Sequence, residues 1–255
     1  MENNLTAAVP TETERKGISR STLKYIVIAA MVLDHIAWGI VDDRAPLIGQ
    51  IMHFFGRLTG PTMAFFLAEG YRYTRSVKRY QLRLGIFALV SWLPYAFFEA
   101  GIDGLIKEPF QLLMQSVIFT LFLGITAIRV WDSEKLGKPA KVLIIIGLTL
   151  LSLIGDWPIM DVLAPLFLHI YRDNRRNRYI AMVLIYFPLN LIQLLSDPEN
   201  NWFAAGVLLV PVLVIGFYNG KGGKKSAFNK WFFYIFYPAH LVVLGILRWY
   251  VFGGN

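Results

Sequence analysis

Six ionisable side chains stand inside apolar segments of this chain, where each costs free energy unless it faces a cavity or a partner. They are Asp34, His35, Arg57, Glu69, Asp161 and His240. Among these residue types, only histidine exchanges a proton near neutral pH, so the two imidazoles are the strongest candidates for general acid–base catalysis. The chain contains no cysteine, which excludes a thiolate nucleophile and a cysteine-ligated metal. We therefore take His35 as the first candidate base and His240 as the second.

The spacing around His35 places two basic groups on one helical face. Lys24 lies eleven residues earlier, which is three turns plus about 20°, or roughly 16 Å along the axis. Asp34 projects about 100° away from His35, so a carboxylate that orients His35 must come from elsewhere. Lys24 alone is equally consistent with a snorkelling flank. An Asp–His pair well inside a span favours function over packing.

Arg57 is expected beside a helix kink. Pro61 lacks the amide that would bond to the carbonyl of Arg57, and the small-residue spacing that begins at Gly56 permits close helix approach. There the guanidinium could hold a ligand amide, stabilise an oxyanion, or pair with Asp34 or Asp161. A purely structural ion pair is an equally good interpretation.

The remaining titratable residues have plainer alternatives. Glu69 stands three residues before Arg72, and we expect the two to pair on a helix surface. Asp161 falls in the outer part of its apolar run. His53 and His169 lie at the ends of apolar runs, where a solvated or interfacial role is sufficient.

The composition is typical of a membrane protein. Hydrophobic residues make up 56% of the chain, aromatic residues 15% and charged residues 16%, with a mean hydropathy of +0.50, whereas about a quarter of an average soluble domain is charged. The net charge of +8 lies in short connections between apolar runs, which favours membrane orientation over nucleic-acid binding. The first run is long enough to be a retained helix and lacks the features of a cleaved signal.

Apolar runs that could span a membrane predict an all-α bundle of about nine transmembrane helices. They are residues 23–41, 54–71, 82–98, 112–130, 140–155, 157–171, 179–195, 202–218 and 231–252. Residues 1–22 form a polar cytoplasmic segment, and 23–255 form a single transmembrane domain.

The connections between these runs alternate in charge. Twenty-one of the 25 lysines and arginines lie before the first run, in every second connection or within two residues of the run ends beside them, and acids occupy the other connections. By the positive-inside rule this predicts a multi-pass protein of the inner membrane, with its amino terminus in the cytoplasm and its carboxyl terminus outside. No metalloprotease, Walker, dinucleotide or nucleophile-elbow motif occurs, so we expect no resident metal.

The chain resembles the TraX family, membrane proteins associated with conjugative pili and named for the F-pilin acetylase. The patches that carry this resemblance bracket nearly the whole chain. They are Leu23, Lys24, Met31 to His35, Gly56, Arg57, Pro61, Phe65, Glu69 to Tyr71, Thr74, Arg75, Tyr80, Arg83, Leu84, Phe87, Ala88, Ser91, Pro94, Phe233, Tyr234, Phe236 to Pro238, His240 and Leu241.

A wider similarity is to the acyltransferase-3 superfamily. The basic residue, ten intervening residues and histidine of its first helix are matched by Lys24 and His35. The run from Phe65 to Tyr71 is similar to that group's Phe-Phe-x-x-Ser-Gly-aromatic run, with Glu69 in place of the serine.

These resemblances imply acetyl transfer from cytoplasmic acetyl-CoA to an amine or hydroxyl, with the amino terminus of pilin or a surface glycan as acceptor. On this hypothesis His35 is the general base, Arg57 stabilises the oxyanion, and His240 and Asp34 complete the catalytic group. The donor phosphates are expected near Lys24 and the basic connection after the second run, at Arg72, Arg75 and Arg83. Candidate substrate-binding residues are Glu69, Asp161 and Tyr237.

Two other classes stay open. A proton-coupled transporter would use Asp34, Arg57, Asp161 and His240 as a relay, although no inverted repeat is evident in the sequence. A non-catalytic scaffold for pilus assembly would tolerate the joint replacement of His35 and Arg57.

Overall fold

The computed structural model describes residues 17–222 and 227–253, and its regular elements over those ranges are helices. The longer helices are α1 (Arg20–Ile36), α2 (Pro46–Gly56), α3 (Thr59–Tyr73), α4 (Val77–Lys107), α5 (Val117–Trp131), α6 (Lys138–Leu151), α7 (Met160–Ile170), α8 (Arg175–Ser196) and α11 (Ala227–Ile246). Shorter helical elements are η1 (Ala37–Val41), η2 (Pro109–Leu113), η3 (Ser152–Ile154), α9 (Pro198–Asn201), η4 (Trp202–Leu208), α10 (Leu209–Pro211), η5 (Val212–Phe217) and η6 (Leu247–Val251). Residues 1–16 of the predicted polar segment lie outside the described residues, as do Lys224 and Lys225.

Each predicted apolar run is helical over most of its length, which confirms the all-α fold class. Among the described residues, four helices are long and apolar enough to cross a membrane: Arg20–Val41, Val77–Lys107, Arg175–Ser196 and Trp231–Val251. Shorter apolar helices cover Val117–Trp131 and Met160–Ile170. The chain is therefore a helical membrane protein, while the count of nine spans and the orientation stay predictions.

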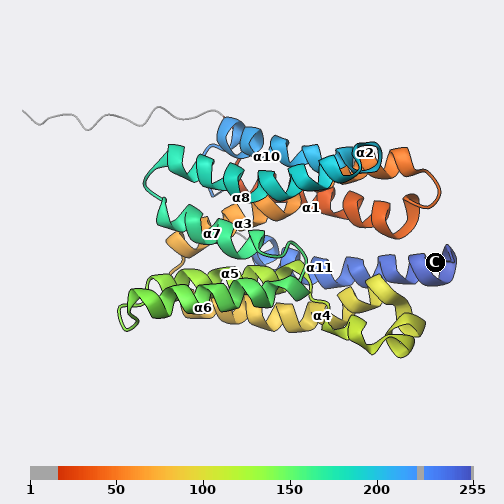
Figure 1. Ribbon diagram of the computed structural model, residues 1–255, viewed down its shortest axis with the longest axis horizontal. Helices are drawn as coiled ribbons and strands as arrows, with labels where there is room; N and C mark the ends of the chain where they lie inside the picture. The colour runs from red at the N-terminus through yellow and green to blue at the C-terminus, as the bar shows by residue number, and fades with distance from the viewer. Residues whose placement is uncertain (1–16, 223–226, 254–255) are drawn as a thin grey trace, which may run out of the picture.

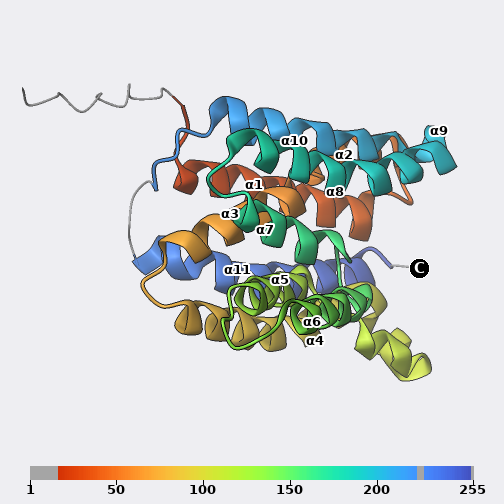
Figure 2. The same cartoon turned by 60° about the vertical axis from the view of Figure 1, so that its left-hand side comes forward.

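The helices run roughly along one axis, and their connections gather at two ends (Figure 1). The α3–α4, α5–α6 and α7–α8 connections lie at one end, which we call the basic end because these connections and the helix ends beside them hold 13 of the 25 lysines and arginines. The α1–α2 connection lies at the opposite end, close to the carboxyl terminus, and we call this the acidic end. The view turned by 60° shows the same arrangement (Figure 2). Charge alternation along the chain thus becomes charge separation along the bundle.

Local sequence explains where several helices begin. Ser19, Ser76 and Asn174 are the N-caps of α1, α4 and α8, and each side chain accepts a hydrogen bond from a backbone amide in the first turn. Such caps satisfy amides that have no partner inside the helix. All three lie at the basic end, so side-chain caps fix the starts of three long helices there.

The second predicted run is two helices, where a single kinked one was expected. α2 ends at Gly56 and α3 begins at Thr59, so the chain breaks at Arg57 and Leu58. The missing amide of Pro61 explains the position of the break, because the last turn before it cannot complete its hydrogen bonds.

Helix α3 occupies the centre of the bundle, and every residue from Thr59 to Glu69 is buried. It contacts α1, α5 and α7. Within a membrane, such packing depends on close fit and satisfied polar groups, because lipid tails are as apolar as the side chains they replace. Glu69 therefore ends a buried helix face and needs partners from its neighbours.

Candidate functional site

His35 and His240 lie against each other at the centre of the acidic half. Their ring centroids are 5.0 Å apart, and the ring planes are inclined at 83°. The Nδ1 atom of His35 is 2.8 Å from the carbonyl oxygen of Met31, and that of His240 is 3.2 Å from the carbonyl oxygen of Phe236. A carbonyl can only accept, so Nδ1 carries the proton in each ring and Nε2 presents its lone pair. The structure thus unites the two imidazoles singled out in the sequence, both in the tautomer that leaves Nε2 as a base.

Aromatic rings surround this imidazole pair. The ring of Tyr237 lies 5.3 Å from His240 and 6.4 Å from His35, and Phe98 of α4 lies 5.4 Å from His35. Phe236 stacks on His240 at 5.4 Å. Within the described residues, His240 Nε2 is buried with no hydrogen-bond partner. Unsatisfied polar atoms of this kind in a buried site call for a functional explanation.

Asp34 faces away from His35, as its position on the helix predicted. Its Oδ1 accepts a hydrogen bond from His53 Nδ1 at 2.8 Å, and His53 Nε2 lies 3.0 Å from Asp42 Oδ2. Both nitrogens of His53 donate to carboxylates, so this ring is an imidazolium. The solvated role expected for His53 is wrong, because the residue is only 5% exposed.

Glycine spacing on α2 is the physical reason for the burial of His53. Gly49, His53 and Gly56 share one face of the helix, and added side chains at the two glycines would run into Asp42 and Asp34 respectively. α2 therefore approaches α1 closely enough for His53 to lie between two carboxylates. This periodic glycine face was the signal in the sequence that could have identified His53.

Arg57 lies between aromatic rings at the break between α2 and α3. Its guanidinium carbon is 5.2 Å from the ring centroid of Trp157 and 4.9 Å from that of Phe203. Among the described contacts it forms no ion pair with Asp34 or Asp161, and its Nε has no hydrogen-bond partner. Cation–π contacts of this type hold a guanidinium while leaving N–H groups for another acceptor.

Asp156 joins this group from the connection between η3 and α7, and the sequence had identified it only as a loop acid. Burial raises the pKa of its carboxyl; Asp34 adds to that rise, whereas Arg57 and the protonated form of His35 oppose it. Its backbone amide donates to the carbonyl of Gln115 at 2.9 Å.

The connection that carries Asp156 is strained. Trp157 and Ile159 have φ values of 53° and 64°, a region that side chains with a Cβ rarely adopt and that costs about 1–3 kcal/mol per residue. Such strain persists where the surrounding packing imposes it, and here it brings a carboxylate close to His35 and Arg57. Sequence periodicity cannot reveal this arrangement, since it depends on how an irregular connection folds back.

Asp161 is fully buried, and it contacts α8 instead of the imidazole pair. Its Oδ1 accepts a hydrogen bond of 2.7 Å from the hydroxyl of Tyr186 in α8, and its Oδ2 has no partner within the described part of the chain. Asp161 therefore links α7 to α8 rather than contacting the imidazole pair directly.

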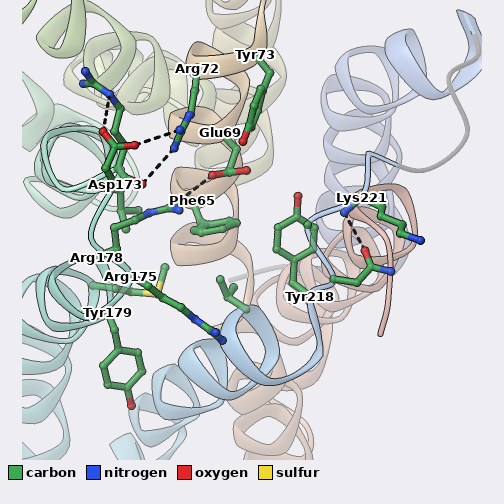
Figure 3. Close-up of a pocket in the computed structure, with 16 residues that line it drawn as sticks. Phe65, Glu69, Arg72, Tyr73, Asp173, Arg175, Arg178, Tyr179, Tyr218 and Lys221 are labelled. Atoms are coloured by element: carbon green, nitrogen blue, oxygen red, sulfur yellow. Dashed lines mark hydrogen bonds and ion pairs between the residues drawn. The ribbon is translucent and has the colours of Figure 1, made fainter. Parts of the chain in front are cut away.

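Glu69 lies at the basic end and pairs with arginines of two other helices. Arg178 Nη2 is 2.8 Å and Arg20 Nη2 is 3.3 Å from its two carboxylate oxygens. The expected surface pair with Arg72 is wrong, because Arg72 binds Asp173 at 3.1 Å instead. α3 turns Glu69 toward α1 and α8, whereas Arg72 reaches the α7–α8 connection (Figure 3).

A cavity of about 740 Å³ adjoins this ion-pair cluster (Figure 3). Its wall comes from α3, the region from α7 to α8, η5 and the segment after η5. The lining residues are Phe65, Glu69, Arg72, Tyr73, Leu168, Arg172, Asp173, Arg175, Arg178, Tyr179, Met182, Val214, Tyr218, Asn219, Gly220 and Lys221.

Of the four residues expected to bind the donor, one lines this cavity. Arg72 lines the cavity, whereas Lys24 lies 5.8 Å from the ring of buried Phe66. Arg75 is exposed on the α3–α4 connection, and Arg83 lies 5.7 Å from the ring of Tyr80. Neither of these two lines the cavity.

His169, expected at an interface with solvent, is also buried, with its Nε2 3.0 Å from Asp132 Oδ1. Asp132 accepts a second hydrogen bond from the Tyr71 hydroxyl at 2.9 Å, so this histidine ties α7 to α3 and α5. Across residues 17–222 and 227–253, no three histidine, aspartate or glutamate side chains are grouped as a metal site requires.

The fold and the site together define a helical membrane protein that holds two imidazoles, a guanidinium and a carboxylate in one half of its bundle and an arginine-lined cavity in the other. The family model described as TraX protein matches residues 19–248. The chain belongs to the TraX family, which confirms the resemblance seen in its motifs.

One relative is the probable fimbrial assembly protein FimC, serogroup H1, of Dichelobacter nodosus. The two chains are 33% identical over 230 residues, which cover 87% of this chain and 92% of that protein. No solved structure matches this chain.

Proposed function

We propose that this chain is an integral membrane acetyltransferase that moves an acetyl group from acetyl-CoA to an amine or hydroxyl. The observation that carries the proposal is the contact between His35 and His240, with both rings presenting Nε2. TraX membership supports it, because the family is named for a pilin acetylase. The fimbrial name of the relative supports a pilus or fimbrial subunit as acceptor, and a surface glycan is the other acceptor that fits.

In this mechanism the His35 imidazole is the general base. Its Nε2 removes the proton from the acceptor as the acceptor nitrogen or oxygen bonds to the thioester carbonyl carbon. The resulting oxyanion is stabilised by Arg57, whose Nε has no hydrogen-bond partner among the described residues. The carbon–sulfur bond then breaks, and the imidazolium returns the proton to the departing thiolate.

The neighbouring groups support this chemistry in separate ways. The charge of Asp156 favours the imidazolium form that His35 adopts during transfer. His240 lies edge-on to His35 and positions either that ring or the acceptor. Asp34 is bound by His53, which holds the Asp34 carboxylate away from His35. Asp34 therefore affects His35 only indirectly.

The same proposal includes a nine-span topology in the inner membrane. With the basic end in the cytoplasm, the connections obey the positive-inside rule and acetyl-CoA reaches the chain from that side. The acidic end then faces the far side of the membrane, where surface proteins and glycans are assembled.

The test is mass spectrometry of fimbrial subunits and surface glycans from cells that carry, lack or carry a His35→Gln form of this chain. The proposal predicts that one molecule loses the mass of an acetyl group when the chain is absent or carries His35→Gln. Thr149→Val is the matched control, since it removes a polar group that bonds only to the carbonyl of Ile145 within α6. An unchanged set of acetylated molecules in the absence of the chain contradicts the proposal.

A proton-coupled transporter is the second candidate, and the observation that favours it is the chain of Asp34, His53 and Asp42. Such a series of carboxylates and imidazoles resembles the proton relays of pumps. Proteoliposomes with an imposed pH gradient distinguish the two. Stabilisation by CoA without gradient-driven uptake supports the enzyme.

A further inference from the structure

The cavity at the basic end has the charge of a binding site for a polyanion. Five cationic and two acidic side chains line it, an excess of three positive charges. Its volume of about 740 Å³ falls within the range of small-molecule pockets, about 300–1,000 Å³. Arginine is the residue best suited to such a ligand, because its planar fork matches phosphate oxygens.

The two acids of the cavity cannot neutralise its cations. Glu69 binds Arg178 on one side of the cavity, and Asp173 binds Arg72 at 3.1 Å and Arg172 at 3.6 Å. The Arg172 side chain is still 46% exposed, so it can turn toward a ligand. Glu69 and Asp173 therefore hold the arginines in place while the net charge stays positive.

Aromatic rings supply a surface for a flat base. Tyr218 lies 5.7 Å from Phe65 and 6.0 Å from Phe66, ring to ring, and the Arg178 guanidinium carbon lies 5.0 Å from the Phe65 ring. In Figure 3, Tyr218 faces the Arg178 and Glu69 pair across the cavity. Stacking of a nucleic-acid base on such rings contributes about 1–3 kcal/mol.

The same rings lead toward the imidazole pair. Phe66 is 5.8 Å from Lys24 Nζ, and Lys24 shares a helical face with His35, roughly 16 Å further along α1. The direction along α1 is therefore the one that a ligand with phosphates in the cavity and a long amide arm would have to follow to reach His35.

We propose that this cavity binds the nucleotide end of the CoA donor, with Arg172, Arg175 and Arg178 contacting its phosphates and Tyr218 stacking on its base. The inference rests on the proposed function and relocates the donor site. The sequence had treated the three arginines of the α7–α8 region as orientation signals only.

The experiment is calorimetric titration of the purified full chain in nanodiscs with CoA, dephospho-CoA, adenosine bisphosphate and pantetheine. We expect CoA and adenosine bisphosphate to bind, dephospho-CoA to bind more weakly and pantetheine to bind least. Arg172→Gln and Arg175→Gln should each weaken CoA binding about tenfold, as the loss of one charge-assisted contact predicts. Arg79→Gln is the matched control, because this exposed arginine lies at the same end but does not line the cavity.

Three outcomes overturn the inference. Unchanged CoA affinity in both cavity variants, with normal melting temperatures, places the donor elsewhere while acetyl transfer stands. Equal weakening by Arg79→Gln shows that only overall charge matters. CoA binding that is lost when anionic lipid is added, at constant ionic strength, shows that a lipid headgroup occupies the cavity. His35→Gln should bind CoA normally but transfer slowly. A wild-type chain that binds CoA and transfers no acetyl group contradicts the proposed function alone.

Discussion

At the acidic end, histidines and carboxylates lie against aromatic rings inside the protein, whereas at the basic end arginines surround a cavity that reaches solvent. The first arrangement restricts water and fixes tautomers, as in the Nδ1 contacts of His35 and His240. The second keeps charge accessible, as in the partly exposed Arg172. The comparison indicates that one end is built for proton transfer and the other for electrostatic capture of a ligand.

The largest expected effect is on turnover, from His35→Gln. Removal of a general base typically costs 10²–10⁴-fold in rate, and we expect a loss on the order of 10³-fold in acetyl transfer. The rate is measured from labelled acetyl-CoA with a fimbrial-subunit acceptor. Retention of full activity would show that the imidazole pair is structural.

Glu69→Ala should have the next largest effect, on stability at the basic end. It leaves Arg20 and Arg178 without the carboxylate that they share. We expect a loss of about 2–3 kcal/mol in unfolding free energy, measured by denaturant titration of the purified protein. Glu134→Ala, an exposed acid of the α5–α6 connection, is the control and should change little.

Gly56→Ala tests the close approach of α1 and α2 at the acidic end. The added Cβ would run into Asp34 and push it from His53, at a cost of about 1–3 kcal/mol. Gly147→Ala in α6 is the control, since it has open space around it and alanine favours helix. Equal melting temperatures for the two variants would show that α2 packs less closely than described.

Asp156→Asn should have the smallest effect on stability, and its sign depends on pH. The folded-state pKa of Asp156 is raised, so the folded protein binds a proton more tightly than the unfolded chain. Its stability therefore falls as pH rises from the ordinary aspartate value through the raised one. The neutral asparagine lacks this penalty, so the variant should melt higher than wild type near neutral pH, and the difference should shrink in acid. A constant difference across the pH range contradicts the assignment.

Sequence patterns predicted the parts of this account that depend on one helix at a time. Hydropathy predicted the helical segments, Pro61 predicted an interruption at Arg57, and the face of α1 predicted that Asp34 would not orient His35. His35 and His240 were both selected from residue chemistry, because both imidazoles stand in apolar runs, and the structure then showed that the two rings are in contact.

Contacts between helices were the part that sequence could not provide. His53 is buried because two glycines bring α2 against α1, and Arg57 faces rings from two distant segments. Asp156 approaches His35 only through a strained connection. Each depends on the rotation of neighbouring helices and on irregular backbone, which hydrophobic periodicity does not specify.

The central claim is that proton transfer occurs at the acidic end and donor binding at the basic end. It is tested most directly by single-turnover acetyl transfer at saturating acetyl-CoA, with His35→Gln and Arg175→Gln measured side by side. The account predicts that saturation restores Arg175→Gln to nearly the wild-type rate, because that residue contributes to donor binding. His35→Gln should stay slow at every donor concentration. Equal recovery of both variants, or of neither, would contradict the separation of chemistry and donor capture between the two ends of the bundle.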